Sequence, residues 1–142
     1  MSKLVPVHPY GWPPPRGYTN GLIAPAGRRL LAVAGQIGWD TAGKLAQPTP
    51  DAPAEDAVVC QFAQALRNVM AVVTAAGGNA EDVISLRIYV TDKHRYAAHS
   101  KQIGVAYRAV FGGHYPAMAL VQVADLLENG ALVEIEALAT LP

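Results

Sequence analysis

The sequence has a single cysteine, Cys60, and carries no net charge. One cysteine cannot form an intrachain disulfide, which fits a reducing compartment. The 11 Lys and Arg residues equal the 11 Asp and Glu residues in number, and the cationic residues are scattered along the chain. Because proteins bind nucleic acid mainly through clustered cations, we expect no nucleic-acid partner.

Targeting and membrane-spanning patterns are also missing. The first residues do not resemble the apolar region of a secretory signal, and no apolar run reaches about 18 residues, the length expected of a membrane span. We therefore expect a cytoplasmic protein with no membrane partner.

Metal-binding and phosphate-binding motifs are lacking as well. His94 and His99 are five residues apart on a predicted helix and therefore diverge, and no Cys and His set has zinc spacing. Gly77-Gly78 is not followed by the Lys-Ser or Lys-Thr of a phosphate-binding loop. We expect no metal site.

What the sequence does contain is enough apolar residues for one core. A chain of 142 residues, 51% of them hydrophobic, has the usual size of a single domain, so we expect one domain over residues 1–142. Residues 1–17 are rich in proline and should form an extended or irregular arm on the surface. The low charge also fits a chain that buries surface in an oligomer.

The last part of the chain carries the most informative pattern. Residues 119–124 and 132–140 are typical of two strands, and the loop between them ends in Asn129-Gly130, which predicts a hairpin. Side chains alternate along the second run, so that one face takes Val133, Ile135, Ala137 and Ala139. The other face takes Leu132, Glu134, Glu136 and Leu138. A face that mixes carboxylates with leucines suits neither a core nor a solvated surface, so we infer that another subunit covers it and that one glutamate lies near a shared pocket.

Two stretches have helical spacing. Apolar residues three and four apart predict a long helix from about Ala54 to Ala76, with Asp51 as its N-cap and Gly77-Gly78 at its end. A second helical pattern spans Lys93–Phe111 and stops at Gly112-Gly113.

The remaining elements complete an α+β fold. Residues 83–91 alternate with a period of two, which predicts a strand whose apolar face carries Ile84, Leu86, Ile88 and Val90. Gly21–Ala24 and Arg29–Gly35 flank the turn residues 25–28 and predict a first hairpin. We expect two layers, a mixed β-sheet with two long helices on one face. The opposite face would be uncovered and would carry Arg87, Tyr89, Gln122, Glu134 and Glu136.

Several motifs in this order resemble one known family, the Rid family, also called YjgF or reactive intermediate deaminase and often labelled endoribonuclease L-PSP. The matching residues run from Gly17 to Thr140 and are Gly17-Tyr18-Thr19-Asn20, Ala34-Gly35-Gln36, Asp40, Gln61, Asn68, Tyr89-Val90-Thr91-Asp92, Pro116-Ala117 and Val133-Glu134-Ile135-Glu136-Ala137. The resemblance implies a chorismate-mutase-like fold and a homotrimer with small-molecule pockets at the subunit boundaries.

The resemblance also implies an activity. Deaminating members hydrolyse an imine or enamine to a carbonyl product and ammonia without metal or organic cofactor. Glu134 matches the glutamate that positions or activates water, so it is the expected catalytic residue. Gly35, followed by Gln36, matches a glycine that lines the pocket, and Tyr18 matches a tyrosine near the site.

One position departs from the family pattern. The arginine that holds the substrate carboxylate after Pro-Ala is replaced by Met118, so we place this chain in an arginine-lacking branch. Arg87 either replaces that cation or pairs with a glutamate, and Arg16, close to Tyr18 in the sequence, is a second candidate to replace it. His114 and Tyr115, just before Pro116, either reach a ligand or lie in a solvated turn.

These observations suggest three functions, which we rank from the best supported to the least supported. The first is imine or enamine deamination. The second is a noncatalytic trimer that binds a small metabolite. The third is an endoribonuclease, which the absence of a basic stripe disfavours.

Overall fold

The computed structural model describes residues 4–51 and 55–142, which form a two-layer α+β fold with a small separate ribbon. The strands are β1 (Val5–Val7), β2 (Gly21–Ile23), β3 (Arg29–Ile37), β4 (Val83–Val90), β5 (Ala117–Gln122) and β6 (Val133–Leu141). The helices are α1 (Ala57–Ala75), the short 3₁₀ turn η1 (Ala80–Asp82), α2 (Lys93–Ala98) and α3 (Ser100–Phe111).

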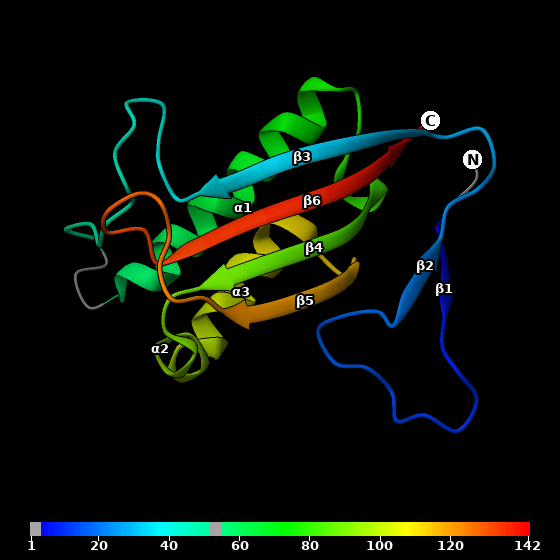
Figure 1. Ribbon diagram of the computed structural model, residues 1–142, viewed down its shortest axis with the longest axis horizontal. Helices are drawn as coiled ribbons and strands as arrows, with labels where there is room; N and C mark the ends of the chain where they lie inside the picture. The colour runs from blue at the N-terminus through cyan, green and yellow to red at the C-terminus, as the bar shows by residue number, and fades with distance from the viewer. Residues whose placement is uncertain (1–3, 52–54) are drawn as a thin grey trace.

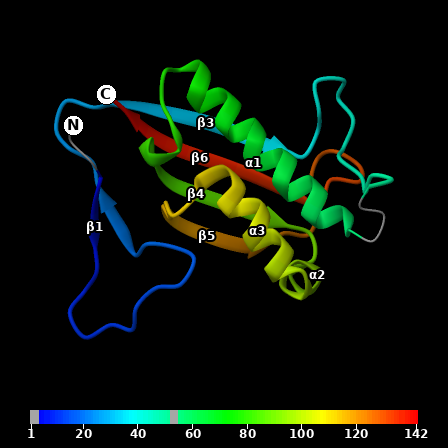
Figure 2. The ribbon, with the colours of Figure 1, turned by 180° about the vertical axis from the view of Figure 1, so that it is seen from behind.

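The main sheet has four strands in the order β3-β6-β4-β5 (Figure 1). Strand β6 is antiparallel to both of its neighbours, whereas β4 and β5 are parallel and are joined through α2 and α3. The prediction of a mixed sheet is therefore confirmed. Seen from behind, α1 and α3 lie across one face of this sheet (Figure 2).

Both predicted hairpins are wrong. Strand β4 lies between β5 and β6, so the last two strands of the chain do not pair with each other. Strand β2 pairs with β1 from the proline-rich arm, and β3 pairs with β6. The predicted turns themselves are present, and Gly27 and Gly130 in them have positive φ angles of 83° and 84°. A turn reverses the chain, but it does not decide which strand becomes the neighbour.

Helix α1 forms because its apolar stripe packs against the sheet. Phe62, Leu66 and Val69 are almost fully buried on this stripe. The N-cap is Asp56, whose carboxylate accepts a hydrogen bond from Val58 N at 2.8 Å, so the prediction of Asp51 is wrong. The predicted start near Ala54 lies outside the described residues. Among these residues α1 alone is long and apolar enough to cross a membrane, but here its buried side contributes to the core.

The second predicted helix is broken. His99 separates α2 from α3, and its ring Nδ1 lies 2.9 Å from the carbonyl oxygen of Arg95. Helix α3 ends where predicted, at Gly112, which has a φ of 58°.

The alternation of β4 and β6 sorts their side chains between core and open face. Leu86, Ile88 and Val90 are buried, as predicted, but a register shift between Val83 and Ser85 leaves Ile84 half-buried. Strand β6 buries its predicted apolar set and leaves Glu134 and Glu136 half-buried on the other face.

Gln122 is a further correction. The parallel register sets Gln122 beside Val90, so it shares the face of that buried residue and not the face of Tyr89. Its side-chain oxygen accepts a hydrogen bond from Lys93 N at 2.9 Å. Ala119 and Val121 are the β5 residues that lie level with Arg87 and Tyr89.

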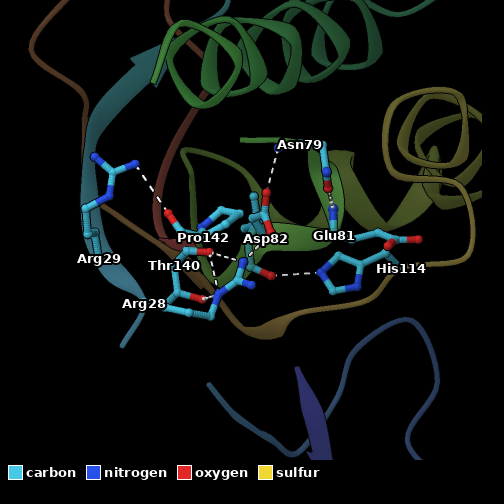
Figure 3. A network of polar contacts seen from close by, with 9 residues as sticks. Arg28, Arg29, Asn79, Glu81, Asp82, His114, Thr140 and Pro142 are labelled. Atoms are coloured by element: carbon cyan, nitrogen blue, oxygen red, sulfur yellow. Dashed lines mark hydrogen bonds and ion pairs between the residues drawn. The ribbon is translucent and has the colours of Figure 1, made fainter. Parts of the chain in front are cut away.

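A largely buried ion pair connects three distant parts of the chain (Figure 3). Arg28 Nη2 contacts Asp82 Oδ1, and the two side chains are 11% and 10% exposed. Arg28 Nε also donates to the carbonyl oxygen of Thr140 at 3.0 Å, and Asp82 Oδ2 accepts from Asn79 N at 2.8 Å. This network ties the start of β3 to η1 and to the end of β6.

Candidate functional site

The polar open face of the sheet carries two linked carboxylates. Glu134 lies level with Tyr89 on the neighbouring strand, and Glu136 lies level with Arg87. The Tyr89 hydroxyl donates to Glu136 Oε1 at 2.5 Å, and this hydrogen bond raises the pKa of Tyr89. Arg87 Nη1 lies 3.8 Å from the same oxygen, so the structure shows the pairing alternative for this arginine. Glu136 is thus occupied by two partners within its own chain.

Glu134 is positioned differently, at an irregularity in the neighbouring strand β3. The β3–β6 register shifts between Val33 and Gln36, and the carboxylate of Glu134 lies over Gly35 at this irregularity. A Cβ added at Gly35 would lie 2.9 Å from the carboxyl carbon of Glu134 and even closer to Oε1. The position therefore requires glycine for Glu134 to keep its place.

Gly35→Ala tests this packing directly. The added methyl would displace the end of the Glu134 side chain, which is flexible, so we expect the melting temperature to change little. A misplacement of about 1 Å at a reacting group lowers kcat by about a hundredfold. The measurement is kcat for ammonia release, the activity that the family resemblance implies, with Gly113→Ala as the matched control, since the Cβ position of Gly113 has no neighbour within 4 Å. Equal activity of the two variants would contradict the role given to Gly35.

Met118 lies on the opposite side of the same sheet. It is level with buried Leu86 and packs against the core, whereas Glu134 is level with Tyr89. A cavity of about 430 Å³ opens beside Met118. Its other described lining residues are Arg16, Gly17, Phe62, Ile88, Tyr96, Ser100, Ile103, Gly104, Tyr107, Arg108 and Tyr115. One chain therefore does not bring Met118 and Glu134 to the same ligand.

Tyr18, His114 and Tyr115 meet at a second hollow. A cleft of about 660 Å³ lies between the β1–β2 ribbon and the body of the molecule and is lined by all three residues. His114 Nε2 donates to the carbonyl oxygen of Val83 at 2.8 Å, so its ring is bonded to the backbone and is not simply solvated. Tyr115 stacks on Tyr107 with ring centroids 5.1 Å apart and also reaches the Met118 cavity.

Gln36 lies apart from these groups. It is level with Ile135, one residue from Glu134, and its amide donates to the carbonyl oxygen of Ala34 at 3.0 Å. The predicted site residues thus fall into three places. Gly35, Gln36, Arg87 and Glu134 lie around β6, Met118 lies in the cavity behind β5, and Tyr18 and His114 lie at the ribbon.

Sequence reasoning missed one residue at the cavity, Arg108, which lies beside Gly104. They are four residues apart on α3 and therefore share one side of the helix, and a Cβ at Gly104 would lie 3.1 Å from Arg108 Nη1. That spacing was the available signal. No group of three or more His, Cys, Asp or Glu within residues 4–51 and 55–142 is placed to hold a metal.

The comparisons with known proteins agree with this fold. The chain matches the endoribonuclease L-PSP family over residues 14–141. It belongs to that family, the Rid or YjgF family. A Salmonella typhimurium relative named 2-iminobutanoate/2-iminopropanoate deaminase is 36% identical over 113 residues, which are 78% of each chain. A mouse relative of the same name is 32% identical over 111 residues, 78% of this chain and 73% of the mouse protein.

Solved structures support the same assignment. YyfB from Yersinia pestis, described as a protein of unknown function of the conserved Rid family, is 30% identical, with a TM-score of 0.78 over 99% of this chain and 100% of YyfB. The YjgF gene product of Escherichia coli is also 30% identical, with a TM-score of 0.62 over 87% of each chain. The expected Rid fold is confirmed.

Proposed function

We propose that this Rid protein hydrolyses a small imine or enamine to a carbonyl compound and ammonia. The observation that carries the proposal is the Glu134 carboxylate, which lies over Gly35 on a sheet face that no helix of the described chain covers. The relatives named 2-iminobutanoate/2-iminopropanoate deaminase support the reaction class.

The chemistry requires little beyond a positioned water. Glu134 accepts a proton from water as the oxygen attacks the carbon of the C=N bond, and the nitrogen leaves as ammonia after it gains protons. One water is consumed for each ammonia released, so the reaction needs no oxidant, reductant or organic cofactor. Burial of Glu134 against a second copy would exclude bulk water and strengthen its interactions with the substrate.

The site is shared between copies in this proposal. Met118 and Glu134 face opposite sides of one sheet, so both can contact a single ligand only when one comes from a neighbouring subunit. We propose a cytoplasmic homotrimer in which the open face of each sheet packs against the next copy, with a small-molecule pocket at each boundary. Half-exposed Val121, at 46%, supports burial of this face.

A second candidate function is noncatalytic binding of a small metabolite. Met118 supports it, because the cavity offers a flexible apolar side chain at the position where the family resemblance implies a carboxylate-binding arginine. The endoribonuclease function remains third, because the net charge is zero and the chain has no clustered basic residues.

Ammonia release from freshly generated imines and enamines separates these candidates. The panel should vary the length of the apolar chain and the presence of a carboxylate. If the protein is a deaminase, ammonia is released steadily and above the spontaneous rate with at least one substrate. Saturable binding of the stable carbonyl products, with no acceleration by the protein for any substrate, would instead favour the binding function.

A further inference from the structure

The cavity beside Met118 has apolar walls. Phe62, Ile88, Ile103 and Tyr107 come from the buried core, and Met118 and Tyr115 close the side toward β5. Burial raises the pKa of Tyr107, and its hydroxyl donates to the carbonyl oxygen of His114 at 2.7 Å. This interior suits the hydrocarbon part of a small molecule.

The charged residues that line the cavity all have one sign. Arg16 and Arg108 line it, and none of its described lining residues is acidic. Neither guanidinium has an ion pair or a side-chain hydrogen bond to any residue within 4–51 or 55–142. An apolar interior with unpaired arginines at its edge is the arrangement that binds a carboxylate with an apolar body.

Gly104 leaves room for the side chain of Arg108. The guanidinium lies back along α3 over Gly104, where a Cβ would be 3.1 Å from Nη1 and 3.7 Å from Nη2. Arg108 is in the last turn of α3, and an arginine there also interacts favourably with the helix dipole. However, its guanidinium lies toward the preceding turn and the cavity, so the dipole alone does not account for its position.

We propose that Arg108 is the carboxylate-binding residue of this cavity and that Met118 contacts the apolar part of the same ligand. In this arrangement the cation comes from α3 and not from β5. The ligand class is a small carboxylate with an aliphatic or aromatic body. That this ligand is the substrate rests on the proposed function, but its binding is measured separately from catalysis.

Hexanoate and its neutral amide, hexanamide, are suitable probes because they differ in charge and share the same chain. The expected result is that Arg108→Ala weakens hexanoate binding by about tenfold to a hundredfold and leaves hexanamide binding nearly unchanged. Lys101→Ala, an exposed cation on the same helix, is the matched control and should bind both probes as the wild type does. Calorimetry gives the affinities, and the Met118 methyl resonance reports occupation of the cavity.

Two further variants keep the test independent of any loss of folding. Gly104→Ala should raise the melting temperature, because alanine favours a helix more than glycine does, and should also weaken hexanoate binding by displacing Arg108. Met118→Arg in the Arg108→Ala background should restore hexanoate binding, because residue 118 lines the same cavity. A protein that is more stable yet binds more weakly cannot be explained by unfolding.

The outcomes separate this inference from the proposed function. Hexanoate binding that depends on Arg108, without ammonia release from any substrate, would support the cavity and reject deamination. Ammonia release whose KM is unchanged by Arg108→Ala would support deamination and overturn the role of Arg108. No binding of hexanoate by the wild type at millimolar concentration, or equal losses for both probes, would also overturn it.

Discussion

Asp82→Ala is expected to lower the free energy of unfolding by about 3–5 kcal/mol, the cost typical of removing one partner from a buried ion pair. The Asp82 and Arg28 side chains are 10% and 11% exposed, so solvent cannot replace the lost carboxylate. Asp82 Oδ2 also accepts a hydrogen bond from Asn79 N, and that amide loses its partner in the variant. Urea unfolding followed by circular dichroism measures the change.

Glu81→Ala is the matched control for this variant. Glu81 is the exposed neighbour of Asp82 in η1, so its removal should change the free energy of unfolding by less than about 0.5 kcal/mol. The double variant Arg28→Ala, Asp82→Ala should lose less stability than the two single variants added together, because no buried charge is left without a partner. If Asp82→Ala and Glu81→Ala were equally stable, the ion pair would have no structural role.

Glu134→Gln is expected to reduce kcat for ammonia release by about a hundredfold or more, the usual contribution of a general base. Glutamine keeps the shape of the side chain but cannot accept a proton from the attacking water. Its packing over Gly35 should be retained, so the melting temperature should change little.

Glu136→Gln provides a carboxylate control on the same strand and the same face. Glu136 already accepts the hydrogen bond from Tyr89 and pairs with Arg87, so it is not free to act on water. Its variant should lose much less activity than Glu134→Gln. The reverse order of activities would contradict the assignment of the reaction to Glu134.

Local patterns in the sequence predicted the individual elements well. The stripe of α1 and the alternation of β6 both follow from burial of one face, so their periods are visible in a single segment. Glycines in the sequence predicted where α1 and α3 end, and the structure shows Gly77 and Gly112 there with positive φ angles of 88° and 58°.

Strand partners could not be predicted in the same way. The hydrophobic patterns of β2 and β5 do not specify which strand lies beside them, and each turn is compatible with more than one pairing. The error at Gln122 has the same origin, because the face of a residue at the end of β5 depends on its register with β4. The Arg28 and Asp82 pair joins residues 54 positions apart and left no local signal.

The sequence named candidate site residues one by one, but it did not show how they are arranged. The family resemblance selected Glu134, Gly35 and Met118, and the sequence pattern indicated that another subunit covers the glutamate face. Nothing in the sequence showed that Met118 lies behind the sheet, because that again depends on the parallel register of β5. Arg108 has a signal in its spacing with Gly104, because a glycine four residues earlier on the same side of a helix leaves space for the arginine side chain.

The central claim is that each site combines Glu134 of one subunit with the Met118 cavity of its neighbour. Glu134→Gln removes the first component, and Met118→Trp fills the second. Each variant alone should be nearly inactive. Refolded together in equal amounts, they should regain activity at about a quarter of the sites, since random assembly of a closed ring places the two intact components together at that frequency. Mixed oligomers no more active than the two parent variants would contradict a site shared between subunits.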